Sequence, residues 1–63
     1  MFNGNLLRKL REERNLTQED LASRVNLTRH SIIRFESGMQ DPSIRMLCAI
    51  ADALGVPPAI FLG

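Results

Sequence analysis

The sequence is poor in the residues from which disulfide-held domains and most enzyme sites are built. It has one cysteine and one histidine, and its three aromatic residues are all phenylalanine. A lone cysteine cannot form an internal disulfide, which favours a reducing compartment, and Cys48 is expected to be a small buried hydrophobe. The sequence has no metal-ligand cluster, no set of residues for nucleophilic catalysis and no glycine-rich phosphate loop. It therefore argues against an enzyme and predicts no cofactor.

The sequence also lacks any segment for export or membrane insertion. The first residues, MFNGNLLRKLREER, do not place an apolar core after a charged start, as a signal peptide does. No apolar run approaches the roughly 20 residues that a helix needs to span a bilayer. We therefore expect a soluble, cytoplasmic protein with no membrane partner.

What is present suffices for one small hydrophobic core. The 63 residues are 44% hydrophobic, without repeats or linkers, and predict a single domain over residues 1–63 made of packed helices. Charge is unevenly distributed, because residues 1–35 hold seven of the eight Lys and Arg residues but four of the seven acidic ones. This is a weak indication of a polyanionic partner on that side, and an ordinary solvated surface is the alternative.

Turn signals divide the chain into short segments, and the first two have helical periodicity. Leucines at positions 6, 7 and 10 predict a helix over about residues 5–14. Thr17 can cap a second helix over about residues 17–25, with Asp20 at the place where a capping box has its acceptor. Asn26 then allows a sharp turn, because asparagine tolerates a left-handed backbone.

The stretch TRHSIIRFESG is predicted to form a helix over about residues 28–36, although its β-branched residues favour a strand by propensity. Thr28 is an N-cap residue, which stabilises a helix by about 1 kcal/mol, and Gly38 is a favoured helix stop. Helical spacing turns Ile32 and Phe35 inward. The outer side then carries Arg29, His30, Ile33 and Arg34.

The last third of the chain predicts one longer helix and a short final turn. Asp41 and Pro42 are expected to open the helix as its N-cap and first-turn residues, and Gly55 to end it. Its inner face is predicted to hold Ile44, Leu47, Ile50, Ala51 and Leu54. The apolar end VPPAIFL either closes the core or contacts a second copy. The predicted fold is all-α, a compact bundle of four to five short helices.

The run LTQEDLASRVNLTRHSIIRFESG resembles the helix-turn-helix of the phage repressor and Cro family of DNA-binding domains, the XRE family. The flanking runs GNLLRKLREERN and DPSIRMLCAIADALGV resemble the first and fourth helices of the family, so the resemblance covers nearly the whole chain. It implies a lambda repressor-like fold and sequence-specific binding of double-stranded DNA by a nucleoid-associated transcriptional regulator, expected to be a repressor. On apolar spacing alone, any helical hairpin would fit equally well.

The resemblance also implies roles for individual residues, because family members insert the third helix into the major groove, N-terminal end first. Base contacts are expected from Arg29, His30, Arg34 and Ile33, and Arg29 suits guanine O6 and N7. Phosphate contacts are expected from Gln18, Thr28, Arg45 and Thr17, with Gln18 also buttressing the recognition helix. Arg11 and Glu36 match an internal ion pair of the family, and two solvated surface charges are the alternative.

One such module buries only about 600–1,000 Å² on DNA, which favours binding in pairs. The expected partner is an inverted-repeat operator bound by a homodimer, with no small-molecule ligand. A second interpretation stays open, a helix-turn-helix module that docks on proteins as an antitoxin-like partner or co-regulator. Exposed hydrophobic side chains at Ile33, Met39 and Leu6 would serve that role.

Overall fold

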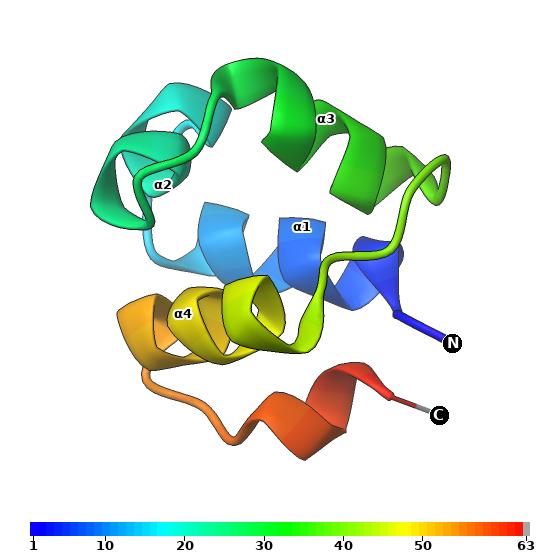
Figure 1. Ribbon diagram of the computed structural model, residues 1–63. Coiled ribbons are helices and arrows are strands. Elements are labelled where there is room, and N and C mark those ends of the chain that lie inside the picture. The colour runs from blue at the N-terminus through cyan, green and yellow to red at the C-terminus, as the bar shows by residue number, and fades with distance from the viewer. Residues whose placement is uncertain (63) are drawn as a thin grey trace.

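A computed structural model describes residues 1–62, which form four α-helices and one 3₁₀ turn (Figure 1). The elements are α1 (Gly4–Glu13), α2 (Gln18–Arg24), α3 (Arg29–Ser37), α4 (Ile44–Leu54) and η1 (Pro58–Phe61). In Figure 1, α1 runs through the middle of the molecule, with α3 on one side of it and α4 and η1 on the other. The predicted all-α fold is confirmed, and the bounds of the first three helices agree with the predicted ranges to within one or two residues.

Each α-helix begins at a side chain that accepts a hydrogen bond from its first turn. These caps are Asn3, Thr17, Thr28 and Ser43. At Thr17 the predicted capping box is complete, because the hydroxyl accepts from the Asp20 N–H at 3.0 Å and the Asp20 carboxylate accepts from the Thr17 N–H at 2.9 Å. Such bonds satisfy N–H groups that have no partner inside the helix, so they set where each helix starts.

The start of α4 was predicted wrongly. Ser43, and not Asp41, is the N-cap, since its hydroxyl accepts from the Met46 N–H at 3.2 Å. The chain leaves α3 at Gly38 and must pass α1 to reach the other side of the molecule (Figure 1), and the residues up to Pro42 form this connection. Ile44 therefore becomes the first helical residue, 73% exposed, and not part of the inner face.

The hydrophobic core is formed by side chains from all five elements and from the N-terminus. Its largest fully buried members are Phe35, Phe61, Leu7, Leu21, Ile32 and Ile50. Phe2 is also buried, with its ring stacked 5.3 Å from that of Phe61, and the Asn3 N–H donates to the Phe61 carbonyl at 2.6 Å. These contacts hold the two chain ends side by side (Figure 1). No periodic pattern marks Phe2 as a core residue, because it precedes the first periodic segment.

The expectations about burial at Cys48 and Leu6 were also wrong. Cys48 is exposed, because helical spacing turns it about 100° from the buried Leu47, toward solvent. Leu6, expected to be available to a partner, is half-buried and packs on the core. At the apolar C-terminal end Phe61 closes the core, whereas Leu62 stays 49% exposed. Within residues 1–62, no helix combines the length and the apolar character needed to cross a membrane.

Candidate nucleic-acid interface

A short turn joins α2 to α3 and sets the angle between them. Asn26 in this turn has a φ of 59°, the left-handed conformation expected for it. The Leu27 N–H donates to the Ala22 carbonyl at 2.8 Å, which closes the turn on the end of α2. Ala22 and Leu21 are buried against α3, where Ile32 is fully buried. Because Ala22 is small, the two helices approach closely, and α2 braces α3 as in a helix-turn-helix unit.

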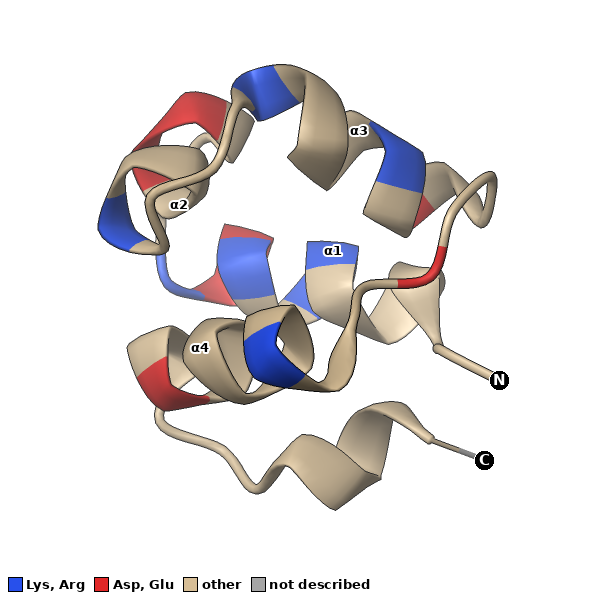
Figure 2. Cartoon of the chain, viewed as in Figure 1, with Lys and Arg blue, Asp and Glu red and all other residues tan. Residues whose placement is uncertain are grey.

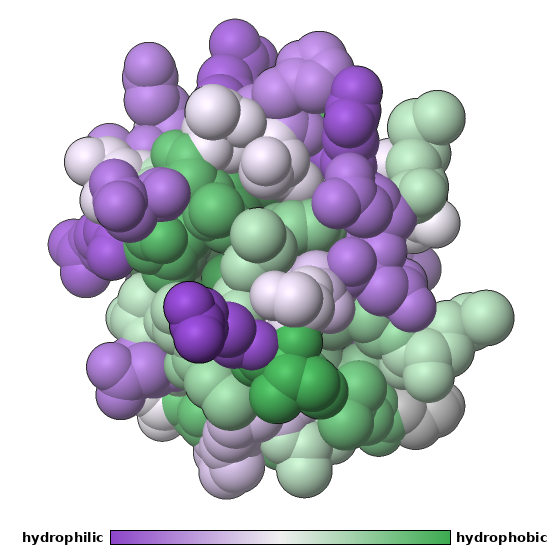
Figure 3. Space-filling model, in the orientation of Figure 1, coloured by the Kyte–Doolittle hydropathy of each residue, from purple (hydrophilic) through white to green (hydrophobic). Residues whose placement is uncertain are grey.

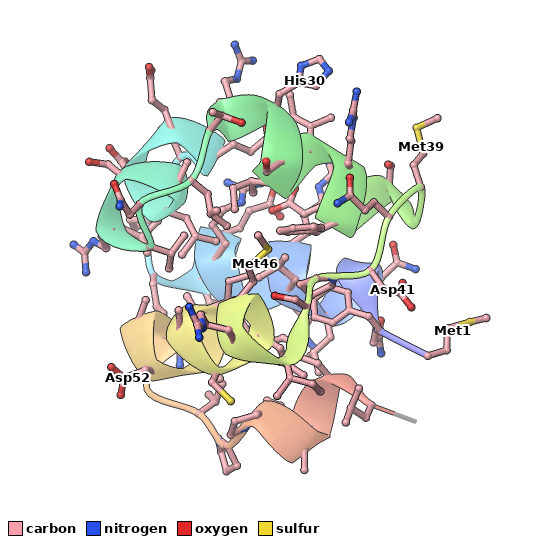
Figure 4. All side chains as sticks on the ribbon, viewed as in Figure 1. Met1, His30, Met39, Asp41, Met46 and Asp52 are labelled. Carbon is pink, nitrogen blue, oxygen red and sulfur yellow. The ribbon has the colours of Figure 1, made fainter. Side chains whose placement is uncertain are left out.

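The outer face of α3 presents basic side chains to solvent. Arg29, His30 and Arg34 are exposed, while Ile32 and Phe35 on the other face are buried. Figure 2 shows basic residues at the start of α3 and again in its second half, and in Figure 4 His30 points away from the body of the molecule. Three of the four residues expected to contact bases therefore share one exposed face. This face suits a ligand that carries negative charge and hydrogen-bond acceptors.

The fourth of these residues, Ile33, lies differently from the sequence expectation. It is half-buried rather than outward, because α1 packs against α3 along that side. Its side chain lines a surface groove of about 400 Å³. The other lining residues are Arg8, Arg11, Gln18, Glu36 and Ser37. Ile33 therefore does not share the fully exposed face of Arg29, His30 and Arg34.

Arg11 and Glu36 meet in a buried ion pair that joins α1 to the C-terminal end of α3. The Arg11 Nε donates to Glu36 Oε2 at 2.6 Å and its Nη2 to Oε1 at 3.2 Å, with side chains only 9% and 5% exposed. The hydrogen bonds to Glu36 raise the pKa of the Arg11 guanidinium above its ordinary value. Nη1 donates to the Leu16 carbonyl at 2.7 Å. The pair thereby ties three parts of the backbone together.

Gln18 extends this network to the start of α2. Its Nε2 donates to Glu36 Oε1 at 3.1 Å, so the half-buried amide is held against the end of α3. Since a side-chain amide has two N–H donors, one remains for another acceptor. The expected buttressing of α3 by Gln18 therefore has a definite route, through the Glu36 carboxylate.

The remaining expected phosphate ligands fall into two groups. Thr17 and Thr28 stand at the N-termini of α2 and α3, where their hydroxyls accept the capping bonds. Arg45 is exposed at the start of α4, a helix that packs against η1 and α2 and not mainly against α3. Thr17 and Gln18 thus lie at the start of α2 and Thr28 at the start of α3, whereas Arg45 lies on α4.

Gly4 positions α3 through its backbone, a role that was not predicted from the sequence. A Cβ atom at Gly4 would lie 2.3 Å from the Phe35 carbonyl oxygen and 2.7 Å from that of Glu36. The first turn of α1 therefore touches the main chain of α3 directly, which only glycine allows. Nothing in the sequence marks this contact, because glycine is also common near helix starts. Within residues 1–62, no group of three or more His, Cys, Asp and Glu residues is placed to hold a metal ion.

Comparisons with known proteins agree with this geometry. A family model described as helix-turn-helix matches residues 7–61. An "Uncharacterized HTH-type transcriptional regulator" of Methanothermobacter thermautotrophicus is 50% identical over 50 residues, which are 79% of this chain and 72% of that protein. The immunity repressor protein of Bacillus phage phi105 is 37% identical over 60 residues, 95% of this chain but 42% of that repressor.

Among solved structures, the P22 c2 repressor in complex with a synthetic operator matches with a TM-score of 0.93. The match covers 98% of this chain and 94% of that chain at 24% sequence identity. At this level of identity the likeness establishes the fold, which is lambda repressor-like as expected.

Proposed function

Since this chain belongs to the Cro/C1-type helix-turn-helix family of transcriptional regulators, a family without enzymatic activity, we propose that residues 1–63 form one DNA-binding domain of a repressor. In this proposal α3 enters the major groove of double-stranded DNA and reads a specific sequence. The observation that carries it is the exposed basic face of α3, held by α2 and by the Arg11–Glu36 pair. The repressor role draws on the likeness to the phage immunity repressor.

Base reading is assigned to the outer face of α3. Arg29, in the first helical turn, places its guanidinium fork on guanine O6 and N7, a contact that discriminates by about 1–3 kcal/mol against a wrong base. His30 and Arg34 reach neighbouring positions along the groove. Ile33, which lines the surface groove of the protein beside α1, contributes an apolar contact to a thymine methyl group of the DNA.

Backbone contacts position the domain without reading sequence. Thr17 and Thr28 offer hydroxyl groups at two helix N-termini, and Gln18 offers the amide N–H that Glu36 does not use. The hydrogen bond to Glu36 holds this donor in a fixed orientation, so it loses little freedom when a phosphate binds. Arg45, expected to join this set, is exposed in the first turn of α4.

The DNA partner is proposed to be an inverted repeat bound by two copies. A single module of this size buries about 600–1,000 Å² on DNA, too little for tight specific binding. Two copies related by a two-fold axis would read half-sites about one helical turn apart. The symmetry of the site then mirrors the symmetry of the protein pair.

Selection of bound duplexes from a random pool tests the proposal. We expect enrichment of an inverted repeat with a guanine at equivalent places in both halves, and loss of enrichment at that guanine for Arg29→Ala. Lys9→Ala, which removes an exposed charge from α1, should select the same sequence as the unaltered protein. A pool that stays unenriched would overturn the proposal and favour docking on a protein instead.

A further inference from the structure

The solvent side of α4 is a continuous face that no other element of the described chain covers. It consists of Ile44, Arg45, Cys48, Ala49 and Asp52, all exposed. The opposite side of the helix is buried, with Leu47, Ile50, Ala51 and Leu54 in the core. We call the five exposed residues the α4 face. Its middle is uncharged and its two ends carry charges of opposite sign.

These two charges have no ionic partner within the described chain. The three salt bridges of residues 1–62 all involve α1 side chains, and neither Arg45 nor Asp52 takes part in one. Arg45 and Asp52 are seven residues apart, so they lie on the same side of α4 but about 10 Å from each other along the axis. They are too far apart to pair within one helix. Both remain available to another molecule.

The order of charges makes the α4 face complementary to itself. When two copies of α4 lie antiparallel about a two-fold axis near Cys48 and Ala49, Arg45 of each copy meets Asp52 of the other. Such an arrangement is isologous, which is the usual form of a homodimer contact. The small side chains of Cys48 and Ala49 stand at the crossing point, where they allow helix axes about 8 Å apart.

We propose that the α4 face binds the α4 face of a second copy of this chain, in antiparallel register with two Arg45–Asp52 pairs. The α4–α4 contact would be the surface through which two copies associate when they bind an inverted repeat. It rests on the proposed function only for the role of the pair on DNA. Because α3 packs on α1 and α2 whereas α4 packs on η1 and α2, covering the α4 face leaves the basic face of α3 open.

Exposed apolar side chains on α4 and near η1 favour association over free solvation. Figure 3 shows hydrophobic residues gathered over α4 and η1, in the lower half of the molecule. Ile44 is 73% exposed on α4 itself, and Ile60 and Leu62 are 41% and 49% exposed at η1. A contact built on one helix face is small, so the pair is weak in free solution. Two half-sites on one duplex raise the effective concentration of one copy near the other, so the α4–α4 contact forms when both half-sites are occupied.

Charge-reversal variants test the register directly. Arg45→Asp gives the α4 face two acidic ends and Asp52→Arg gives it two basic ends, so either variant alone should self-associate about tenfold more weakly or worse, because like charges then meet twice. In an equimolar mixture each acidic end meets a basic end, and association should return. Lys9→Asp and Glu13→Arg, which make the same charge changes on exposed α1 positions, should behave as the unaltered protein.

Cross-linking at the single cysteine reports the geometry. With helix axes about 8–10 Å apart, the two Cys48 side chains lie on either side of the two-fold axis, within reach of a short cross-linker. A short bis-maleimide should therefore join two copies of the unaltered protein and of the charge-reversed mixture, but not either variant alone. Equal cross-linking of all samples, or none in the mixture, would overturn the proposed register.

Binding to a single half-site separates this inference from the proposed function. Asp52→Arg should bind one half-site at least as well as the unaltered protein yet lose cooperativity on the inverted repeat. Cooperativity retained by Asp52→Arg would refute the α4 contact while leaving DNA reading intact. Failure of every sample to bind a half-site, with the cross-linking pattern preserved, would refute DNA reading and leave the α4 contact standing.

Discussion

The Arg11 guanidinium and the Glu36 carboxylate form a two-point ion pair that is buried between α1 and the C-terminal end of α3. Nε to Oε2 measures 2.6 Å and Nη2 to Oε1 measures 3.2 Å, and the same carboxylate accepts from Gln18 at 3.1 Å. A single carboxylate thus fixes α3 relative to both α1 and the start of α2. The face expected to read DNA is therefore held from behind by polar bonds as well as by the core.

Arg11→Ala should lower the free energy of unfolding by about 3–5 kcal/mol, because it leaves the Glu36 charge buried without its partner. For a chain of this length each 1 kcal/mol corresponds to about 4–8 °C in melting temperature, so thermal melting gives a large signal. Arg8→Ala removes an exposed arginine paired to Glu12 and should change stability by no more than about 1 kcal/mol. Equal, small shifts for both variants would contradict a structural role for the pair.

Gly4→Ala should destabilise the protein although alanine is the better helix former. The added Cβ would lie 2.3 Å from the Phe35 carbonyl oxygen, a backbone atom that cannot move without displacing α3. We expect a loss of about 1–3 kcal/mol, as for other overpacked sites, measured by urea unfolding. Asn5→Ala, at the exposed neighbouring position, serves as the control and should be neutral or stabilising. A stable Gly4→Ala protein would mean that α1 and α3 can separate at no cost.

Arg29→Ala should weaken binding to the selected duplex by about 1–3 kcal/mol and reduce the preference for guanine at its position. Binding to unrelated duplexes should fall less, because that binding depends on total charge. Titrations of both duplexes at one fixed salt concentration measure the two effects. Lys9→Ala removes the same charge from α1 and should weaken both titrations alike. If Arg29→Ala also weakens both alike, Arg29 contacts the backbone and not a base.

Asp20 should make stability depend on pH in the acid range. The hydrogen bond from the Thr17 N–H holds the pKa of the Asp20 carboxyl below the ordinary value of 3.8. The unfolded chain therefore takes up a proton before the folded one, so this contribution is present above pH 3.8 and is lost as the pH falls through the lower, folded-state pKa.

Asp20→Asn keeps an acceptor for the capping bond but removes the titrating group. Its melting temperature should lie below that of the unaltered protein at about pH 5, and the gap should narrow as the pH falls below the pKa of the unfolded chain. Asp41→Asn changes an exposed carboxylate that caps no helix and provides the comparison. A gap for Asp20→Asn that stays constant down to about pH 2 would contradict the assignment.

The elements that could be predicted from the sequence are those set by contacts within a few residues. These contacts are hydrogen bonds or backbone preferences that act inside one or two turns of chain. They involve Thr17 with Asp20, Thr28 as the cap of α3, Asn26 in the turn and Gly38 after α3. The periodicity of apolar residues then indicates which side of each helix is buried. These local signals placed the first three helices and the basic outer face of α3.

Only the tertiary structure decided the features that depend on which elements meet. Ser43 rather than Asp41 caps α4 because the connection has to pass α1, and Ile33 is half-buried because α1 lies beside it. Gly4 contacts residues more than 30 positions away, and Phe2 stacks on Phe61 at the other end of the chain. A local sequence pattern does not indicate contacts between residues that lie so far apart in the chain. Burial and close approach are settled by packing between helices, which a one-dimensional periodicity does not contain.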